Sequence, residues 1–107
     1  MAKLGPRDHT ISLAVAATYT RRHRNTAPGP VKDGDHAHSF QADQVLALLQ
    51  QKGCAALRIY YGLDDHGQRA PILVGVDDTG KDMTSGLLLQ LGWPCPPYCD
   101  DTSTLKG

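Results

Sequence analysis

Two stretches of alternating residues, joined by a short polar turn, constrain the fold of this chain most strongly. Large apolar side chains occupy every second position in both stretches: Leu57, Ile59, Tyr61, Ile72, Val74 and Val76. A period of two with β-branched and aromatic residues is typical of β-strands. The residues between the stretches, 64–68, favour a turn, and Gly67 can take a positive φ there. The sequence therefore predicts an antiparallel β-hairpin within residues 53–78.

A two-stranded hairpin needs a second layer to be stable. Because two strands alone are only marginally stable in water, helices or the sheet of another subunit should cover one face. Pro71 lies near the start of the second stretch, and a residue without an N–H suits the start of a strand or the edge of a sheet. An edge can be blunted or can contact another copy of the chain, and both alternatives stay open.

The chain has 107 residues, which suits one domain with one core. We expect a small α+β domain over residues 10–100, in which two or three helices pack on the hairpin and an extended Cys- and Pro-rich tail follows. Residues 1–9 are expected to be a flexible arm and residues 101–107 a flexible tail. Residues 25–38 are rich in Pro, Gly and Asp and are expected to be a loop.

The clearest helix is predicted over residues 40–52. Ser39 is the expected N-cap, and Gly53 suits the position that follows a helix. The apolar positions fall on one face of this helix: Ala42, Val45, Leu46, Leu48 and Leu49. A helix with one apolar face packs that face against a core. Since the hairpin follows directly, we expect this helix to cross it.

Another helix is predicted over residues 10–24, with Thr10 as its N-cap. Ile11, Val15 and Tyr19 would form its apolar stripe. A strand is the rival interpretation, because apolar residues also alternate with Ser12 in this region. Several alanines and a basic C-terminal end favour the helix.

The pattern after the hairpin is ambiguous. Asp82 can cap a short helix that ends at Gly92, but Gly86 disfavours it, and residues 87–91 form a third strand in the alternative. The prolines of residues 93–99 exclude a helix, so this tail must be extended. We expect Trp93 and Tyr98 to hold it against the body of the protein.

Charge is spread unevenly along the chain, although the net charge is zero. Up to and including Lys32 there are six Lys and Arg against one Asp, and after it five against ten. This asymmetry either marks an anionic partner or lets the two segments pack together, and we favour packing. The candidate anion-binding residues are Arg21, Arg22 and Arg24, and they make nucleic acid an unlikely but possible partner.

No apolar run reaches the length that a membrane span requires, so we expect a cytoplasmic protein without a membrane partner. No Ser, Cys or His spacing matches a nucleophilic triad, and we predict no catalytic residue.

The cysteines are the sharpest chemical feature. Cys95 and Cys99 lie four positions apart in the proline-rich tail, and Cys54 stands where the helix meets the hairpin. Three thiolates and one histidine would make a closed tetrahedral zinc site, with His38 as the fourth ligand and His36 or His66 as alternatives to it. Free structural thiols and a Cys95–Cys99 disulfide are the alternatives, and all three stay open.

Three blocks of the sequence resemble a group of small bacterial proteins of the Bacteroidetes type whose activity is not known. The blocks are RIYYG at residues 58–62, LVGVD at 73–77 and CPxxC at 95–99. The resemblance extends over about residues 10–100. It implies a bacterial cytoplasmic protein with a recurring pattern of three cysteines, and it implies no particular function.

The function that these features favour is a non-enzymatic protein-interaction module, which could bind a partner protein or assemble with its own copies. The candidate contact residues are Tyr60, Tyr61, Trp93 and Tyr98. The first alternative is a metal- or thiol-dependent enzyme centred on Cys95 and Cys99. The second alternative is nucleic-acid binding through the arginine cluster.

Overall fold

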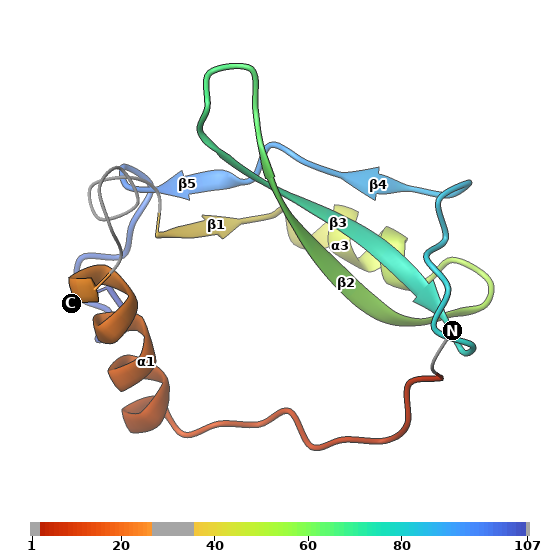
Figure 1. Ribbon diagram of the computed structural model, residues 1–107, viewed down its shortest axis with the longest axis horizontal. Coiled ribbons are helices and arrows are strands. Elements are labelled where there is room, and N and C mark those ends of the chain that lie inside the picture. The colour runs from red at the N-terminus through yellow and green to blue at the C-terminus, as the bar shows by residue number, and fades with distance from the viewer. Residues whose placement is uncertain (1–2, 27–35, 107) are drawn as a thin grey trace. The chain divides into compact units, whose positions relative to one another are not determined.

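The computed structural model describes residues 3–26 and 36–106. Within these residues the chain forms two compact units, one from residues 3–6 and 39–92 and the other from residues 7–26, 36–38 and 93–106. Helices occur together with antiparallel strands, so the predicted α+β class is confirmed (Figure 1). Residues 27–35 of the predicted loop lie outside the described residues.

The first unit is built on the predicted hairpin. β2 (Cys54–Leu63) pairs antiparallel with β3 (Arg69–Asp77), and Ile59 lies opposite Leu73. The register is regular from Ala56 to the turn and shifts only between Cys54 and Ala56. The alternating pattern therefore predicted both the strand type and the pairing correctly.

Asp64 holds the turn between these strands. Its Oδ1 atom accepts the backbone N–H groups of His66 and Gln68 at 2.8 and 2.9 Å. Gly67 has a φ of +75°, as the turn requires. The hydrogen bonds to this carboxylate stabilise its charged form and lower the pKa of Asp64 below the ordinary 3.8.

A third strand extends the sheet on the far side of β3. β4 (Leu88–Leu89) pairs antiparallel with β3, which gives the strand order β2-β3-β4. The predicted helix after Asp82 is therefore wrong, and the alternative strand is right. The side chain of Gln51 explains the outcome, because its Oε1 atom accepts the Leu87 N–H at 2.8 Å and a Cβ atom on Gly86 would collide with it.

α3 (Ala42–Leu49) is the predicted helix, shorter at both ends. It follows Gln41, whose side chain makes no capping bond, and it ends before Gln50. Ser39 is not its cap, because this residue is the extended end of β1 (Ala37–Ser39). Gly53 has a φ of +87° and shapes the turn into β2 instead of following the helix directly.

Leu48 of α3 is the centre of the core in this unit. Its side chain is fully buried and packs with Leu73 of β3 and Leu89 of β4, and Phe40 and Val45 lie against this cluster. In Figure 1, α3 lies behind the hairpin. The predicted apolar face is confirmed only in part, because Leu46 and Leu49 are exposed.

The second unit begins with α1 (Leu13–Thr26), so the helix interpretation of this segment is right. Ser12 caps it in place of Thr10: its Oγ atom accepts the Val15 N–H at 3.2 Å, whereas the Thr10 hydroxyl bonds Asp8. Ala17 is the buried residue of this helix. The predicted stripe is wrong, since its three members are exposed: Ile11, Val15 and Tyr19.

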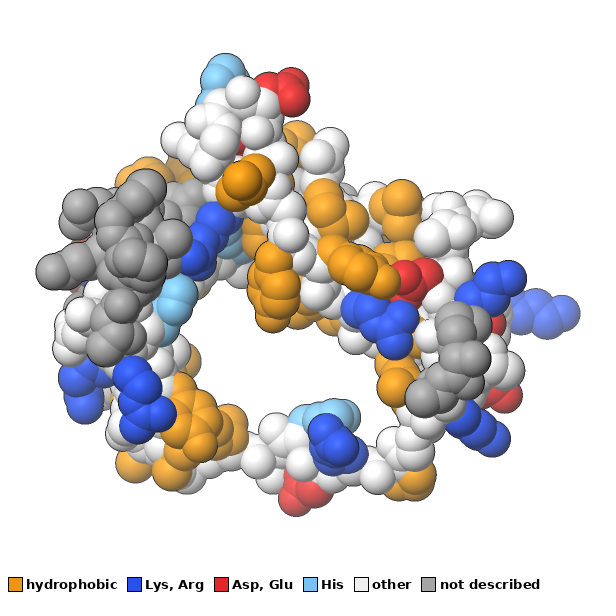
Figure 2. All heavy atoms as spheres, in the orientation of Figure 1, with side chains coloured by type: hydrophobic (Ala, Val, Ile, Leu, Met, Phe, Trp, Pro, Cys, Tyr) orange, Lys and Arg blue, Asp and Glu red, His pale blue; other side chains and the backbone are white. Residues whose placement is uncertain are grey.

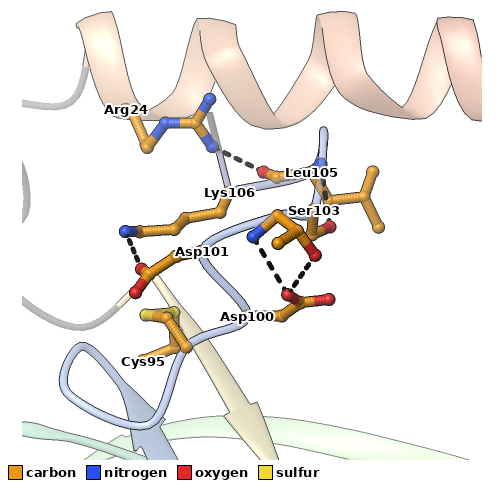
Figure 3. The surroundings of a disulfide bond; sticks show 9 residues. Arg24, Cys95, Asp100, Asp101, Ser103, Leu105 and Lys106 are labelled. Atoms are coloured by element: carbon orange, nitrogen blue, oxygen red, sulfur yellow. Dashed lines mark hydrogen bonds and ion pairs between the residues drawn. A yellow bond between two sulfur atoms is a disulfide. The ribbon is translucent and has the colours of Figure 1, made fainter.

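Residues 93–95 of the tail are extended as expected, whereas residues 96–98 form a turn. β5 (Trp93–Cys95) pairs with β1 in a two-stranded sheet, and the His36 N–H donates to the Cys95 carbonyl at 2.8 Å. Figure 3 shows the segment that follows, which contains a Cys95–Cys99 disulfide. Beyond it, Arg24 of α1 donates to the Leu105 carbonyl at 2.7 Å.

α1 has 14 residues and is the longer of the two described helices. A membrane span needs about 20 apolar residues. Within the described residues, no helix has the length and apolar content needed to cross a membrane.

Candidate functional site

The candidate site is the outer edge of β2. Among residues 3–26 and 36–106, β3 is the one strand that pairs with β2. In an antiparallel ladder, successive residues direct their backbone N–H and C=O groups alternately toward one neighbour and toward the other. The groups that point away from β3 can therefore pair with another strand.

Hydrogen bonds at both ends of the hairpin identify these outward-pointing residues. The Gly75 carbonyl accepts the Met83 N–H at 2.9 Å, so the backbone groups of Gly75 point away from β2. Leu57 is opposite Gly75 and so points away from β3. At the turn, the Asp64 N–H donates to the Gln68 carbonyl at 2.8 Å, so the even-numbered residues of β2 point inward. The outward-pointing residues of the regular part of β2 are Leu57, Ile59, Tyr61 and Leu63, which we call the open edge.

The same four residues carry large apolar side chains on a single face of the sheet. Their exposed fractions are 37%, 46%, 91% and 73% in chain order. Leu73 lies opposite Ile59 on this face and is only 4% exposed. Packing against α3 therefore buries this face of the sheet at β3, whereas the same face remains largely exposed to solvent at β2. Figure 2 views the hairpin from its other side, where hydrophobic side chains also lie along it.

β2 has few of the features that protect natural edge strands from pairing. Its sequence, CAALRIYYGL, contains no Pro, no Lys and no acidic residue. The one charged side chain, Arg58, donates from Nη1 to Asp82 Oδ1 at 2.5 Å and lies 3.4 Å from the Gly80 carbonyl oxygen. The irregularity between Cys54 and Ala56 affects only the start of the strand.

Asp82 joins Arg58 to Tyr60, because its second oxygen accepts the Tyr60 hydroxyl. The bond from Tyr60, followed by the bond and charge of Arg58, lowers the pKa of Asp82 below 3.8. In return, the bond to Asp82 raises the pKa of the Tyr60 phenol above 10.0 and that of the Arg58 guanidinium above its ordinary value. Each shift favours the ordinary protonation state of its group near neutral pH.

Cys54 belongs to the first unit, and Cys95 and Cys99 belong to the second. Cys95 and Cys99 are bonded to each other, with their Cα atoms 4.8 Å apart, and a disulfide sulfur cannot act as a thiolate ligand (Figure 3). Cys54 is a free thiol in the first unit, and its Sγ atom lies 3.3 Å from the Ala56 carbonyl oxygen. His38 is part of β1.

Over the described ranges, no group of three or more His, Cys, Asp or Glu side chains is placed to hold a metal ion. Of the three states expected for Cys95 and Cys99, the structure has the disulfide. A zinc site made by Cys54, Cys95, Cys99 and His38 stays a prediction, and it requires the reduced protein.

The predicted anion-binding arginines have internal contacts. The guanidinium of Arg24 donates to the Leu105 carbonyl (Figure 3), and that of Arg22 stacks 5.7 Å above the centre of the Tyr19 ring. Arg21 is exposed on the same helix. A role for these three residues in binding anions stays a prediction.

The four predicted contact aromatics divide between the two units. Tyr60 bonds Asp82, and Tyr61 belongs to the open edge. In the second unit, Trp93 and Tyr98 meet edge to face with their ring centres 5.0 Å apart. Sequence reasoning missed Leu63 and the acceptor role of Asp82. Continued alternation beyond Tyr61 could have revealed Leu63, whereas Asp82 lies too far along the chain from its partners.

Comparison with known proteins gives no match to a family model, to a curated protein or to a solved structure. The resemblance to the Bacteroidetes-type group therefore stays a prediction, and the arguments below depend on the residues of this chain alone.

Proposed function

We propose that this protein is a non-enzymatic interaction module that binds a polypeptide by adding a strand to β2. The observation that carries the proposal is the open edge, where outward backbone groups and exposed apolar side chains belong to the same residues: Leu57, Ile59, Tyr61 and Leu63. Strand addition uses main-chain hydrogen bonds for affinity and alternate side chains for specificity. The open edge offers both over one continuous stretch.

The binding free energy gained when a strand is added to β2 has two parts. Each new backbone hydrogen bond contributes about 0.5–1.5 kcal/mol. Each square ångström of apolar surface removed from water adds about 25 cal/mol. Since Tyr61 and Leu63 are 91% and 73% exposed in this structure, a partner strand that covers them gains from the second part as well.

Amide hydrogen exchange measured by NMR tests this proposal. The probe is a peptide of alternating valine and threonine, as long as β2, and the control is the same peptide with alternate backbone nitrogens methylated. We expect the probe to slow exchange at Ile59 and Tyr61 at least about tenfold and to leave Arg58 and Tyr60 unchanged, because the latter two already face β3. The methylated peptide should have no effect. If Ile59 and Tyr61 of the monomeric protein exchange at the same rate with and without saturating probe, the proposal is wrong.

Two predictions from the sequence, the cytoplasmic location and the zinc site, depend on the redox state of Cys95 and Cys99. Disulfides are uncommon in the cytoplasm, where thiols are kept reduced. A zinc site requires reduced Cys95 and Cys99, and a cytoplasmic location favours the reduced state without requiring a metal. Neither affects the proposed role of the open edge, because all its residues lie in the first unit.

A further inference from the structure

We infer that the strand added to β2 is the β2 of a second copy of this chain, paired antiparallel about a two-fold axis at Ile59. This inference rests on the proposed function and names its partner. It predicts a homodimer in which two three-stranded sheets join through their open edges.

The charge distribution of β2 favours a copy of itself as the partner. The strand carries one charged residue, Arg58, and Asp82 of the same chain neutralises it at 2.5 Å. Two such edges can therefore approach without the like-charge repulsion that separates most edge strands. An acidic or basic partner strand would find no uncompensated charge of opposite sign on β2.

Backbone direction limits the registers that two copies can adopt. Only the odd-numbered residues of the open edge can exchange hydrogen bonds across the new junction, so each must face an odd-numbered residue of the partner. A two-fold axis at any residue of β2 satisfies this condition, and Arg58, Ile59 and Tyr60 are the positions near the middle of the strand. The three registers differ in their side-chain pairs and in the length of strand that is paired.

The axis at Ile59 gives the best of these registers. It pairs residues 55–63 with their copies, so that only Ala55 at the end of the pairing lies within the irregularity between Cys54 and Ala56. Leu57 then faces the partner's Tyr61, and Arg58 faces the partner's Tyr60. Aliphatic–aromatic and cation–aromatic neighbours across two strands are favourable.

The registers with the axis at Arg58 or at Tyr60 are less favourable. An axis at Arg58 places this guanidinium directly opposite the partner's Arg58, and like charges in that position destabilise a sheet. It also extends the pairing to Cys54, across the irregularity. An axis at Tyr60 pairs only residues 57–63 and leaves part of the strand unpaired.

Sedimentation equilibrium over about 1–100 µM protein tests for the dimer, because an interface of this small size suits dissociation at micromolar concentrations. We expect the mass of the unaltered protein to rise from monomer to dimer over this range. Ile59→Lys places two ammonium groups at the axis and should leave a monomer throughout. Leu88→Lys is the matched control on β4, because Leu88 is also exposed, at 51%, and it should dimerise normally. Circular dichroism of both variants verifies that they fold.

Oxidative cross-linking then tests the register in a Cys54→Ser background. At the axis, the Cα atoms of facing hydrogen-bonded residues lie about 5.5 Å apart, which a disulfide can bridge. We expect Ile59→Cys to cross-link to its own copy and Tyr61→Cys not to, because Tyr61 and its copy lie on opposite sides of the axis. Efficient cross-linking at Tyr61→Cys would overturn the register.

A protein that stays monomeric at the highest concentration would overturn the dimer, and so would a dimer that Leu88→Lys dissociates and Ile59→Lys does not. The peptide experiment separates this failure from that of the proposed function. A monomer whose Ile59 amide is protected by the valine–threonine peptide still binds strands at the open edge. A monomer without that protection refutes both.

Discussion

The two units of this protein are stabilised in different ways. In the first unit, buried hydrophobic side chains from one helix and the sheet form a core cluster of Leu48, Leu73 and Leu89, and Val74 and Val76 of the sheet are buried as well. In the second, Ala17 is the one buried hydrophobic residue among those described, and a disulfide and hydrogen-bonded turns link the tail instead. The comparison teaches that a short chain can combine burial in one part with cross-linking in another.

This difference predicts that the two units respond to different perturbations. Hydrogen exchange can follow each unit by its own amides. The single tryptophan, Trp93, adds a fluorescence signal from the second unit.

The largest expected effect is loss of the core in the first unit. Leu48→Ala removes a fully buried side chain and should lower the free energy of unfolding by about 2–5 kcal/mol. Leu46→Ala on the same helix is the matched control, and because Leu46 is exposed it should cost about 0.5 kcal/mol or less. Urea denaturation, monitored through the hydrogen exchange of the β3 amides, measures the free energy of unfolding of both variants. Equal costs for the two variants would show that α3 does not pack as described.

Reduction of the disulfide should come next in size and should act on the second unit. Cys95 and Cys99 are separated by four positions, and breaking a disulfide that closes a loop of that length lowers the free energy of unfolding by about 2 kcal/mol. We expect faster exchange at Tyr98, whose N–H donates to the Pro94 carbonyl at 2.9 Å, and a change in Trp93 fluorescence. The double variant Cys95→Ser/Cys99→Ser should reproduce the result without reductant. If the amides of β3 lose as much protection, the two units are not independent.

The smallest loss of stability should occur when the pH is lowered, and it should appear in both units. Hydrogen bonds lower the folded-state pKa of Asp64 in the first unit and of Asp100 in the second below 3.8. A lowered pKa means that the carboxylate contributes its full stability above about pH 3.8, its unfolded value, and loses it as the pH falls through the folded value. Both carboxylates are exposed, so the loss should be modest.

Single substitutions show which carboxylate is responsible for the pH dependence of each unit. Asp64→Asn should remove part of the pH dependence seen at the amides of the hairpin and leave Trp93 unaffected. Asp100→Asn should do the reverse, because Asp100 accepts the Thr102 N–H at 3.0 Å in the second unit. Each variant is the control for the other. A single titration shared by both signals would contradict the separation.

The sequence predicted the parts of the fold that depend on neighbouring residues. Alternation from Leu57 to Val76 specified the hairpin, and Asp64 and Gly67 specified its turn. The helix after Asp82 was wrong because its competitors are distant in sequence: the Gln51 side chain binds the Leu87 N–H, and Val76 bridges to Asp82. Local propensity carries no information about such contacts.

The candidate site was predictable only in part for a related reason. Alternation shows that Ile59 and Tyr61 share a face, but it does not show which edge of the strand lacks a neighbour. That depends on β4, which pairs with β3 and leaves β2 outermost. The state of Cys95 and Cys99 was open because spacing alone permits thiols, a metal or a disulfide.

Pro71 sets a limit on how far these sheets can grow. It lies in β3 opposite Tyr61, on the side of the strand that β4 would reach if it were longer, and it has no N–H to offer there. β4 itself consists of two residues. In the proposed dimer, the two-fold pairing of β2 strands uses the long edge of each copy and leaves only the short β4 edges. We therefore expect the assembly to end at two chains and not to polymerise into a filament.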